Sequence, residues 1–446
     1  MSLLKKVEEF CLEYDMLPPD GTVIAAVSGG ADSMCLLDVL RRLSGRHGFK
    51  LLACHFDHRL RGEESTGDAA FVAEYCRRVD IECLMGGGDV ADYAAGKGCG
   101  VEEAARHLRY AFFEDCIKQI GGALVATAHN ADDNAETFIM NIMRGAGGRG
   151  LCAIPPVRGA YIRPLLPATR EEIERYLCEH DIPHREDSTN ALDDVLRNRI
   201  RHHVAPQLRA LCPGWSENVL TASALARQDE QCLDNMARDF VEQHCGGGYI
   251  PIKPFSALHK AVASRVVRNM VATSISRQHV DAVLTLAASA DPSAAVDLPG
   301  VRVRREYDRL VFGAAPPAGF EPRELSCGVD VSIPELGKRF LLSEQAPGGA
   351  IYNSFTTYLF KKSEVCGIIN VRPRKSGDTL KLRGCGTKSL KKLFIERKIP
   401  AVMRDSIPVI ADDAGVLAVV GIGADVRAAA VAGDEAYRLI WEDIEQ

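Results

Sequence analysis

The sequence lacks any pair of cysteines separated by two residues, although it contains 15 cysteines among 446 residues. Structural zinc sites and iron–sulfur clusters commonly rely on such pairs, so neither is indicated. The cysteines stand in apolar runs such as Met34-Cys35-Leu36, where a reduced cysteine behaves as a small buried hydrophobe. The odd number also argues against complete pairing in disulfides. We therefore expect a cytoplasmic protein.

The sequence also lacks an apolar run long enough to cross a membrane, which takes about 20 residues. The most apolar late stretch, residues 414–433, is interrupted by Asp425 and Arg427. Residues 1–17 are charged throughout and lack the apolar core of a signal peptide. We expect a soluble protein without membrane contact.

There is no excess of positive charge, since the net charge is −6. Composition alone therefore gives no hint of a nucleic-acid partner, although function depends on where the charge is concentrated. The apolar fraction of 46% and the charged fraction of 26% are typical of a globular protein. Because 446 residues exceed one ordinary core, two or three domains are expected.

Strand-like and helix-like segments alternate over about the first 167 residues. Apolar runs at residues 22–27, 51–56 and 123–128 have amphipathic segments between them. This alternation predicts a parallel sheet covered by helices on both faces. Helical periodicity then dominates from about residue 171 to 288, and residues 301–312 are typical of a hairpin that turns near Tyr307.

The predicted fold class is α/β, with an N-terminal doubly wound parallel sheet, a helical middle domain and a small α+β C-terminal domain. The expected boundaries are 1–215 for the first domain, 216–312 for the mainly helical domain, and 326–446 for the basic C-terminal domain. Residues 313–325 are rich in glycine and proline and are expected to form a linker.

The most specific motif is SGGADS, which consists of Ser28, Gly29, Gly30, Ala31, Asp32 and Ser33. It follows a predicted strand and precedes a predicted helix. Two glycines let the backbone approach a phosphate, two serines offer hydroxyl donors, and the helix start offers free N–H groups. No lysine is present, so the loop is not a Walker A motif. It suits the pyrophosphate that leaves when ATP yields AMP, with Asp32 placed for a bridging Mg²⁺.

Polar residues also follow the next two predicted strands, where open α/β sheets bind ligands. His55 follows one strand and His129 the other. If a helix starts there, Asp132 and Glu136 share one face, and His129 pairs with Asp133 in the same way. Such carboxylates repel unless a cation lies between them, and the candidates are Mg²⁺, an arginine or a substrate amine. Helix capping by the two aspartates, or a zinc site with the histidines, are the alternatives.

These motifs resemble those of a known family. SGGADS is similar to the SGGxDS motif of the PP-loop ATP pyrophosphatase superfamily. HFDHRLR, ARHLRY, AHNADDNAET, MRGAGGRGL and RPLL, followed by EDSTN and RNRIR, occur in the order and spacing of tRNA(Ile)-lysidine synthetases. The resemblance covers the first 210 residues and resumes at residues 371–421. Asn130 is a departure, since a second histidine is often expected there.

The resemblance implies a ligase that uses ATP and Mg²⁺ to adenylate the C2 oxygen of the wobble cytidine in tRNA(Ile) with a CAU anticodon. The ε-amine of free L-lysine then displaces AMP and gives lysidine. By the family pattern, residues 28–33 and His55 hold ATP, and Asp32 and Asp132 hold Mg²⁺. His129, Asp132, Asp133 and Glu136 surround the lysine, and Arg109 and Arg197 contact the nucleotide or the transition state. Which carboxylate acts as base stays open, and so does the oligomeric state, for which a homodimer is one candidate.

The C-terminal part carries a concentrated positive charge. Residues 372–404 hold eleven Lys and Arg against two acidic residues, a net charge of +9. Such a patch suits RNA phosphates, although a charge run can also be a solvated face. Lys388, Lys391 and Lys392 are expected on one helix face, near Arg397, as tRNA-binding residues. Residues 197–203 form a second, smaller basic cluster.

Three rival functions are less well supported. An enzyme of the same superfamily that makes 2-thiocytidine in tRNA would use clustered cysteines, which the sequence lacks. A GMP-synthetase-like amidotransferase would need a glutaminase region, and none is visible. A non-catalytic RNA-binding module would have no need of His129, Asp132 and Glu136.

Overall fold

The computed structural model describes residues 2–59, 63–185, 196–313, 319–346 and 356–444. The chain divides into two compact units, Met1–Cys232 and Leu233–Gln446, and each is described by itself. Within the described ranges, no helix is both long enough and apolar enough to cross a membrane. The motif residues Leu60, Arg61 and Glu186–Asn190, and part of the expected linker, lie outside the described residues.

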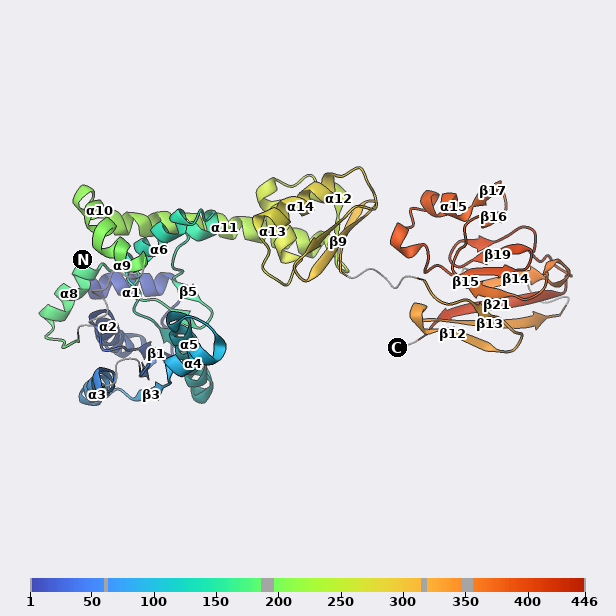
Figure 1. Ribbon diagram of the computed structural model, residues 1–446. Helices are drawn as coiled ribbons and strands as arrows, with labels where there is room; N and C mark the ends of the chain where they lie inside the picture. The colour runs from blue at the N-terminus through green and yellow to red at the C-terminus, as the bar shows by residue number, and fades with distance from the viewer. Residues whose placement is uncertain (1, 60–62, 186–195, 314–318, 347–355, 445–446) are drawn as a thin grey trace. The chain divides into compact units, whose positions relative to one another are not determined.

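The first unit is built on a six-stranded sheet with the order β3-β2-β1-β4-β6-β5, and Figure 1 labels β1, β3 and β5 of it. All neighbouring strands are parallel except β5 and β6. The central strand is apolar because helices cover both of its faces, and the expected strands are confirmed. The strands are β1 (Thr22–Ala26), β2 (Lys50–Asp57), β3 (Cys83–Gly87), β4 (Leu124–Ala126), β5 (Val157–Arg158) and β6 (Tyr161–Ile162).

Alternate residues of the sheet point into two separate cores. Val23 and Ala25 join one core with residues of α1, α2, α3 and α8. Ile24 and Leu52 join the other with Phe113 of α5. Helices on both faces confirm the doubly wound prediction. These helices, with the short α4 beside α5, are α1 (Leu3–Glu13), α2 (Ala31–His47), α3 (Glu63–Arg78), α4 (Val90–Lys97), α5 (Val101–Ile120) and α8 (Arg170–Glu179).

The sheet order places the chemistry at one edge. β1 lies between β2 and β4, so the chain leaves the sheet in opposite directions from this strand. The carboxyl ends of these three parallel strands therefore meet, at the type of position where α/β sheets bind ligands. The β1–α2 loop, the end of β2 and the start of α6 (Ala131–Met143) are brought together there.

A set of helices completes the first unit beside α6. Ala135 of α6, Ala205 and Trp215 form a small buried cluster that packs two later helices onto α6. The longest of them, α11, continues past residue 232 into the second unit. The elements are α7 (Gly148–Leu151), α9 (Leu196–Arg199), the π-helix η2 (Ile200–Val204), α10 (Ala205–Leu211) and α11 (Trp215–His244).

The second unit begins with a four-stranded antiparallel sheet in the order β7-β10-β9-β8, packed against helices. Glu306 pairs with Arg309, so the predicted hairpin turn at Tyr307-Asp308 is confirmed. The elements are β7 (Tyr249–Pro251), α12 (Ile252–Phe255), α13 (Lys260–Asn269), α14 (Arg277–Ala288), β8 (Ala295–Leu298), β9 (Val301–Glu306) and β10 (Arg309–Phe312).

The C-terminal part contains two further sheets that share a core. Phe340 and Phe360 of one sheet join Val371 and Ile410 of the other in a single buried cluster, and with the helix α15 (Leu390–Glu396) these sheets make the predicted α+β domain. The sheets have the orders β11-β15-β18-β19-β20 and β12-β13-β21-β14. Their strands are β11 (Arg323–Glu324), β12 (Asp330–Ile333), β13 (Lys338–Gln345), β14 (Thr357–Lys361), β15 (Asn370–Arg372), β18 (Val409–Asp412), β19 (Gly415–Val419), β20 (Gly423–Ala424) and β21 (Ala436–Asp443).

A hairpin and one short helix carry part of the basic region. The strands β16 (Thr379–Lys381) and β17 (Thr387–Ser389) pair, and α15 (Leu390–Glu396) follows at once. Leu380, Leu393 and Phe394 bury this subdomain against β18 and β19. The helix expected around residues 388–397 is therefore present but starts two residues later.

Candidate active site

The SGGADS loop is held in shape by its last serine. The hydroxyl of Ser33 accepts hydrogen bonds from the N–H groups of Ser28 and Gly29, at 3.1 and 3.2 Å. It donates to the carbonyl of Gly30 at 2.9 Å, and the side chain is buried. Ser33 thus uses its hydroxyl to close the loop, while Ser28 is exposed.

The two glycines of the loop differ in backbone conformation and position. Gly29 has φ +94°, in the left-handed region that other residues rarely adopt. Gly30 is the N-cap of α2 and makes no side-chain cap hydrogen bond. The first N–H groups of α2 therefore have no side-chain acceptor at this cap, which is the arrangement that favours an anion.

Asp32 occupies the first turn of α2 and faces the start of α6. Its Oδ1 is buried without a hydrogen-bond partner among the described residues. Burial and the nearby Asp133 carboxylate raise the pKa of Asp32 to about 6, while the neighbouring Asn130 amide and the Arg170 and Arg201 charges act to lower it. The Nδ2 of Asn130 is likewise buried without a partner in the described part of the chain. The loop and α6 therefore lie close enough for their charges to interact.

The start of α6 corrects two sequence expectations. The N-cap is Asn130, whose Oδ1 accepts from Asp133 N at 2.9 Å, and Asp133 Oδ2 accepts from Asn130 N at 3.2 Å. Capping is thus shared by Asn130 and Asp133, and Asp132 takes no part in it. His129 precedes the cap, so the prediction that it shares a helix face with Asp133 is wrong.

Two arginines, one from α9 and one from η2, form hydrogen-bonded ion pairs with the carboxylate of Glu136, which is 1% exposed. Arg201 donates through Nε to Oε1 at 2.7 Å and through Nη2 to Oε2 at 2.9 Å. Arg197 donates through Nε to Oε2 at 2.8 Å. Both arginines also lie 3.2 Å from Asp133 Oδ1. The cation expected between these carboxylates is therefore arginine in this structure.

The carboxylate of Asp132 accepts hydrogen bonds from other residues than Glu136 does. Its Oδ1 accepts from Arg209 Nη2 at 2.9 Å, and its Oδ2 accepts from the backbone N–H of Arg170 at 2.8 Å. Asp132 and Glu136 do lie on the same helix, as predicted. The sequence does not predict three of these carboxylate partners: Arg170, Arg201 and Arg209. Each lies 38 to 77 positions after the aspartate it contacts, and local sequence patterns do not report contacts over such separations.

The two histidines are held by hydrogen bonds to their Nδ1 atoms. His55 is buried, with Nδ1 2.8 Å from the carbonyl oxygen of Val27. His129 Nδ1 lies 3.0 Å from the hydroxyl of Thr127. Burial lowers the pKa of His129 to about 4, against the pull of Asp133, and Arg109 is among the positive charges that lower it further. Arg109 is itself desolvated, which lowers its pKa. The imidazole of His129 is therefore uncharged at neutral pH.

The two basic clusters need correction. Arg197 and Arg201, from the smaller basic cluster of residues 197–203, are bound to carboxylates at α6, so their charges are balanced within the protein. Lys388 lies on β17, not on the helix, and its Nζ is 2.5 Å from Glu396 Oε2. Lys391 and Lys392 are exposed on α15, and Arg397 is exposed at its C-cap.

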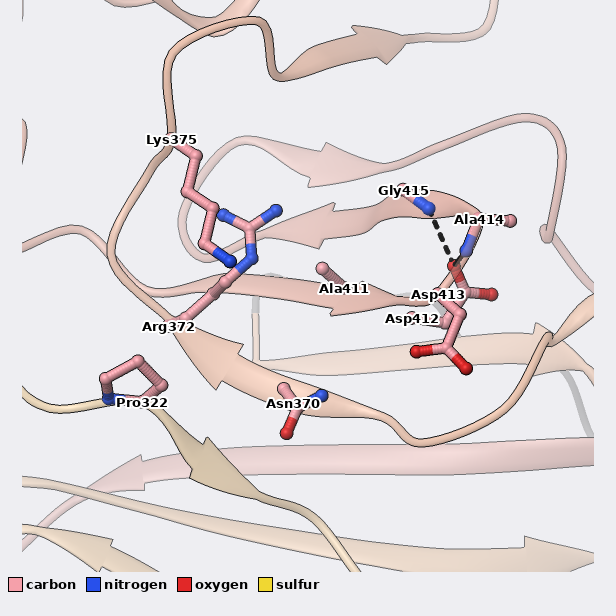
Figure 2. A pocket seen from close by; sticks show the side chains of 9 residues that line it. All are labelled: Pro322, Asn370, Arg372, Lys375, Ala411, Asp412, Asp413, Ala414 and Gly415. Atoms are coloured by element: carbon pink, nitrogen blue, oxygen red, sulfur yellow. Dashed lines mark hydrogen bonds between the residues drawn. The ribbon is translucent and has the colours of Figure 1, made fainter.

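A cavity of about 520 Å³ lies in the C-terminal part (Figure 2). Figure 2 shows Arg372 and Lys375 on one side and the turn at Asp412 and Asp413 on another. Arg372 is bound to Asp378 through both terminal nitrogens at 2.8 Å, and Asp412 to Arg427 at 3.0 Å. These two pairs lie in the walls of the cavity. It is lined by Pro322, Asn370, Arg372, Lys375, Ala411, Asp412, Asp413, Ala414 and Gly415.

No group of three or more His, Cys, Asp and Glu side chains in the described residues is arranged to hold a metal ion. Mg²⁺ is often bound by phosphate oxygens of a nucleotide, together with one or two carboxylates and several waters.

Three family models match separate parts of the chain. A PP-loop domain matches residues 3–208. A TilS substrate binding domain matches residues 250–311, and a TilS substrate C-terminal domain matches residues 369–441. The SGGADS loop and α6 both fall within the PP-loop match.

Curated relatives match over nearly the whole chain. A tRNA(Ile)-lysidine synthase of Geobacillus kaustophilus is 33% identical over 459 aligned residues, which cover 98% of each chain. Its counterpart in Geobacter sulfurreducens is 33% identical and covers 98% of this chain and 97% of its own. The one from Bacillus subtilis is 32% identical and covers 92% of both.

Proposed function

The chain belongs to the tRNA(Ile)-lysidine synthase family, and from this premise we propose how its residues form lysidine on tRNA(Ile). The observation that carries the proposal is the closeness of Asp32 and Asp133, whose charges interact. It supports the proposal that the PP-loop and the carboxylates of α6 belong to one site. Nucleotide activation and amine attack can then take place at the same carboxyl edge of the sheet.

The PP-loop is proposed to hold the triphosphate of ATP. The open N–H groups at the start of α2 and the left-handed turn at Gly29 support contact with the β- and γ-phosphates. Ser28 is exposed, and its hydroxyl lies 3.1 Å from that of Ser33, so it would turn away from Ser33 to donate to a phosphate, whereas Ser33 keeps the loop closed. The C2 oxygen of the wobble cytidine attacks the α-phosphorus of ATP and forms a new oxygen–phosphorus bond. The bond between the α-phosphorus and the pyrophosphate oxygen breaks, so the cytidine is left as an adenylate and pyrophosphate leaves into the loop.

Asp32 fits a magnesium ion better than Asp132. Within the described part of the chain, one carboxylate oxygen of Asp32 is buried and accepts no hydrogen bond, whereas both oxygens of Asp132 accept one. Asp32 would bind Mg²⁺ together with phosphate oxygens. Asp132 would bind the metal only after losing its hydrogen bond from Arg209. When bound, Mg²⁺ would neutralise charge on the phosphates.

L-Lysine is proposed as the second substrate, held by the carboxylates of α6. An ammonium group can take the place of Arg197 at Glu136 and Asp133 without leaving a buried carboxylate unpaired. Arg197 is 34% exposed in its side chain, against 18% for Arg201, so it is the arginine with more room to move. Once displaced, Arg197 is positioned to contact the adenylate, together with Arg109.

The ε-amine must lose a proton before it attacks C2 and expels AMP. The uncharged His129 does not repel the incoming ammonium, and a carboxylate of α6 takes the proton. The carboxylates engaged with Arg197 lose this partner when the amine arrives, so Asp133 and Glu136 are the candidates.

The C-terminal domain is proposed to bind the tRNA backbone through Lys391, Lys392 and Arg397. All three are exposed: Lys391 and Lys392 lie in the first turn of α15, and Arg397 is its C-cap. The proposal also includes a cytoplasmic location. It further includes assembly as a homodimer, which sedimentation of the purified protein would test.

The reaction is tested in a single incubation. Purified protein, Mg-ATP and radiolabelled L-lysine are mixed with tRNA(Ile) bearing the CAU anticodon, and in parallel with methionine tRNA of the same anticodon. We expect label in the isoleucine tRNA alone, with release of AMP and pyrophosphate. Cleavage of ATP to AMP without lysine incorporation would point to a different nucleophile.

A further inference from the structure

A guanidinium group ties α11 to the segment that follows α7. Arg227 of α11 donates through Nη2 to the carbonyl oxygens of Cys152 at 2.7 Å and Ile154 at 3.1 Å. Its Nε is buried without a hydrogen-bond partner among the described residues. One nitrogen that holds two carbonyls two residues apart fixes both the position and the curvature of this segment.

The same segment is held from its other side by α6. The N–H group of Ile154 donates to Asn134 Oδ1 at 3.0 Å. Asn134 is completely buried and stands between Asp133 and Glu136 in the sequence of the helix. Between the two anchored carbonyls, Ala153 has φ +45°, a left-handed conformation that a residue with a Cβ keeps only when its surroundings impose it.

A second contact joins α11 to α6 directly. Trp215, the first residue of α11, packs against Ala135 of α6 in a small buried cluster. Helix α11 therefore meets α6 at its start and, twelve residues later, through the Cys152–Ile154 segment. Beyond residue 232 the same helix enters the second unit, which contains the part that matches a substrate binding domain.

We propose that Arg227 is a positioning residue, which couples α11 to the carboxylates of α6 through Ile154 and Asn134. Arg227 acts in this role through its neighbours. Its two hydrogen bonds hold the Cys152–Ile154 segment against α11 within the first unit. The hydrogen bond from Ile154 to Asn134 then fixes this segment to the turn of α6 that carries Asp133 and Glu136.

A role confined to stability would give a different result from a positioning role. A residue that stabilises the fold alone changes the fraction of active protein and leaves the rate per active molecule unchanged. A positioning residue lowers the rate per active molecule at saturating tRNA, because a small misplacement of reacting groups is costly in rate. The inference rests on the proposed role of α6, which Glu136→Gln tests separately in the same assay.

The experiment measures lysine incorporation into tRNA(Ile) by the full chain, with active-site concentrations taken from single-turnover amplitudes. The variants are Arg227→Gln, Arg227→Lys, Asn134→Ala and the double variant Arg227→Gln/Asn134→Ala. Arg238→Gln is the matched control, because this exposed arginine on the same helix bonds only to Asn235 three residues earlier in the described contacts. Binding of tRNA is measured in parallel by filter retention.

We expect Arg227→Gln to lower kcat on the order of 10-fold and to change the Kd for tRNA less than about twofold. Arg227→Lys should recover part of the rate, and the double variant should be no slower than the slower single variant, because both residues act on one segment. Unchanged kcat per active site in Arg227→Gln and Asn134→Ala, or multiplicative effects in the double variant, would overturn the proposal. If Arg227→Gln does not fold, Arg227→Lys and Asn134→Ala carry the same test. A fully active Glu136→Gln would instead remove the proposed role of α6.

Discussion

Arg201 and Glu136 form a two-point ion pair, with Nε 2.7 Å from Oε1 and Nη2 2.9 Å from Oε2, although 65 positions separate them in the sequence. The carboxylate is 1% exposed, so it depends on its arginine partners to remain charged at this depth. The same Nη2 lies 3.2 Å from Asp133 Oδ1. Arg201 therefore fixes the relative position of two carboxylates that lie one turn apart on the same side of α6.

Removal of Arg201 is the first prediction. Arg201→Ala should destabilise the first unit by about 3 kcal/mol, because it leaves a buried carboxylate with a single arginine. It should also slow lysine incorporation on the order of 100-fold, since the carboxylates lose their fixed positions. Arg201→Lys should be less severe but below wild type, because an ammonium cannot reproduce the two-point geometry.

The matched control is Arg199→Ala, which removes an exposed arginine at the end of α9, two residues before Arg201. Its rate and stability should stay close to those of the unmodified protein. Equal losses in the two variants would mean that general positive charge, and not the pair with Glu136, is what matters.

Asp32 should link nucleotide binding to magnesium and to pH. We expect Asp32→Asn to weaken Mg-ATP binding at least about 10-fold and to leave the weak binding of metal-free ATP nearly unchanged, as titration calorimetry with and without EDTA would show. The pKa of about 6 means that protons compete with the metal below pH 6. Affinity for Mg-ATP should therefore fall about fourfold between pH 7.5 and 5.5. Asp115→Asn on the exposed face of α5 is the control, and an equal pH dependence in Asp32→Asn would contradict this assignment.

His129 should make the first unit less stable in acid. Its pKa is about 4 in the folded protein and near its ordinary value in the unfolded chain, so only the unfolded chain binds a proton between these values. Stability is therefore complete above pH 6.5 and is lost as the pH falls toward 4, by at most about 3 kcal/mol. His129→Gln should lose less over this window. Urea unfolding in a Trp441→Phe background leaves Trp215, buried in the first unit, as the fluorescent reporter. Parallel losses in both proteins would count against a buried neutral imidazole.

The parallel sheet of the first unit and the SGGADS loop could be predicted from the sequence, because the patterns that indicate them are local. A buried strand, two glycines and a helix start are adjacent in residues 22–33, and the physics of each can be assessed from its neighbours. The hairpin at Tyr307-Asp308 was predictable for the same reason. The cap of α6 was misjudged by one or two residues, because His129, Asn130, Asp132 and Asp133 are all plausible near a helix start and the choice depends on contacts made elsewhere.

The arginine partners of α6 could not be predicted, because their contacts are set by the packing of α8, η2 and α10 against the sheet. In the sequence, Arg197 and Arg201 look like members of a basic cluster for RNA. Their spacing of four residues does place both on one face, and that is the signal that could have suggested a shared carboxylate. Charge counts alone cannot separate a paired arginine from a free one.

The same distinction divides the basic residues of the C-terminal part and leads to the last prediction. Lys388 is bound to Glu396, and Arg372 is bound to Asp378, so their charges are already balanced. Lys391 and Lys392 are exposed on α15. The double variant Lys391→Glu/Lys392→Glu should weaken tRNA binding about 10-fold or more near physiological salt, because each lysine that contacts a phosphate releases a counterion.

The salt dependence of binding separates phosphate contact from a general effect of charge. If both lysines contact phosphates, the slope of log Kd against log salt concentration should fall by about 1.4 to 1.8 in Lys391→Ala/Lys392→Ala. Lys388→Ala is the internal comparison, and it should change the slope much less because its charge is held by Glu396. kcat at saturating tRNA should stay unchanged in the double alanine variant, since α15 takes no part in the chemistry proposed at α6. An unchanged slope together with an unchanged Kd would remove α15 from the tRNA-binding surface.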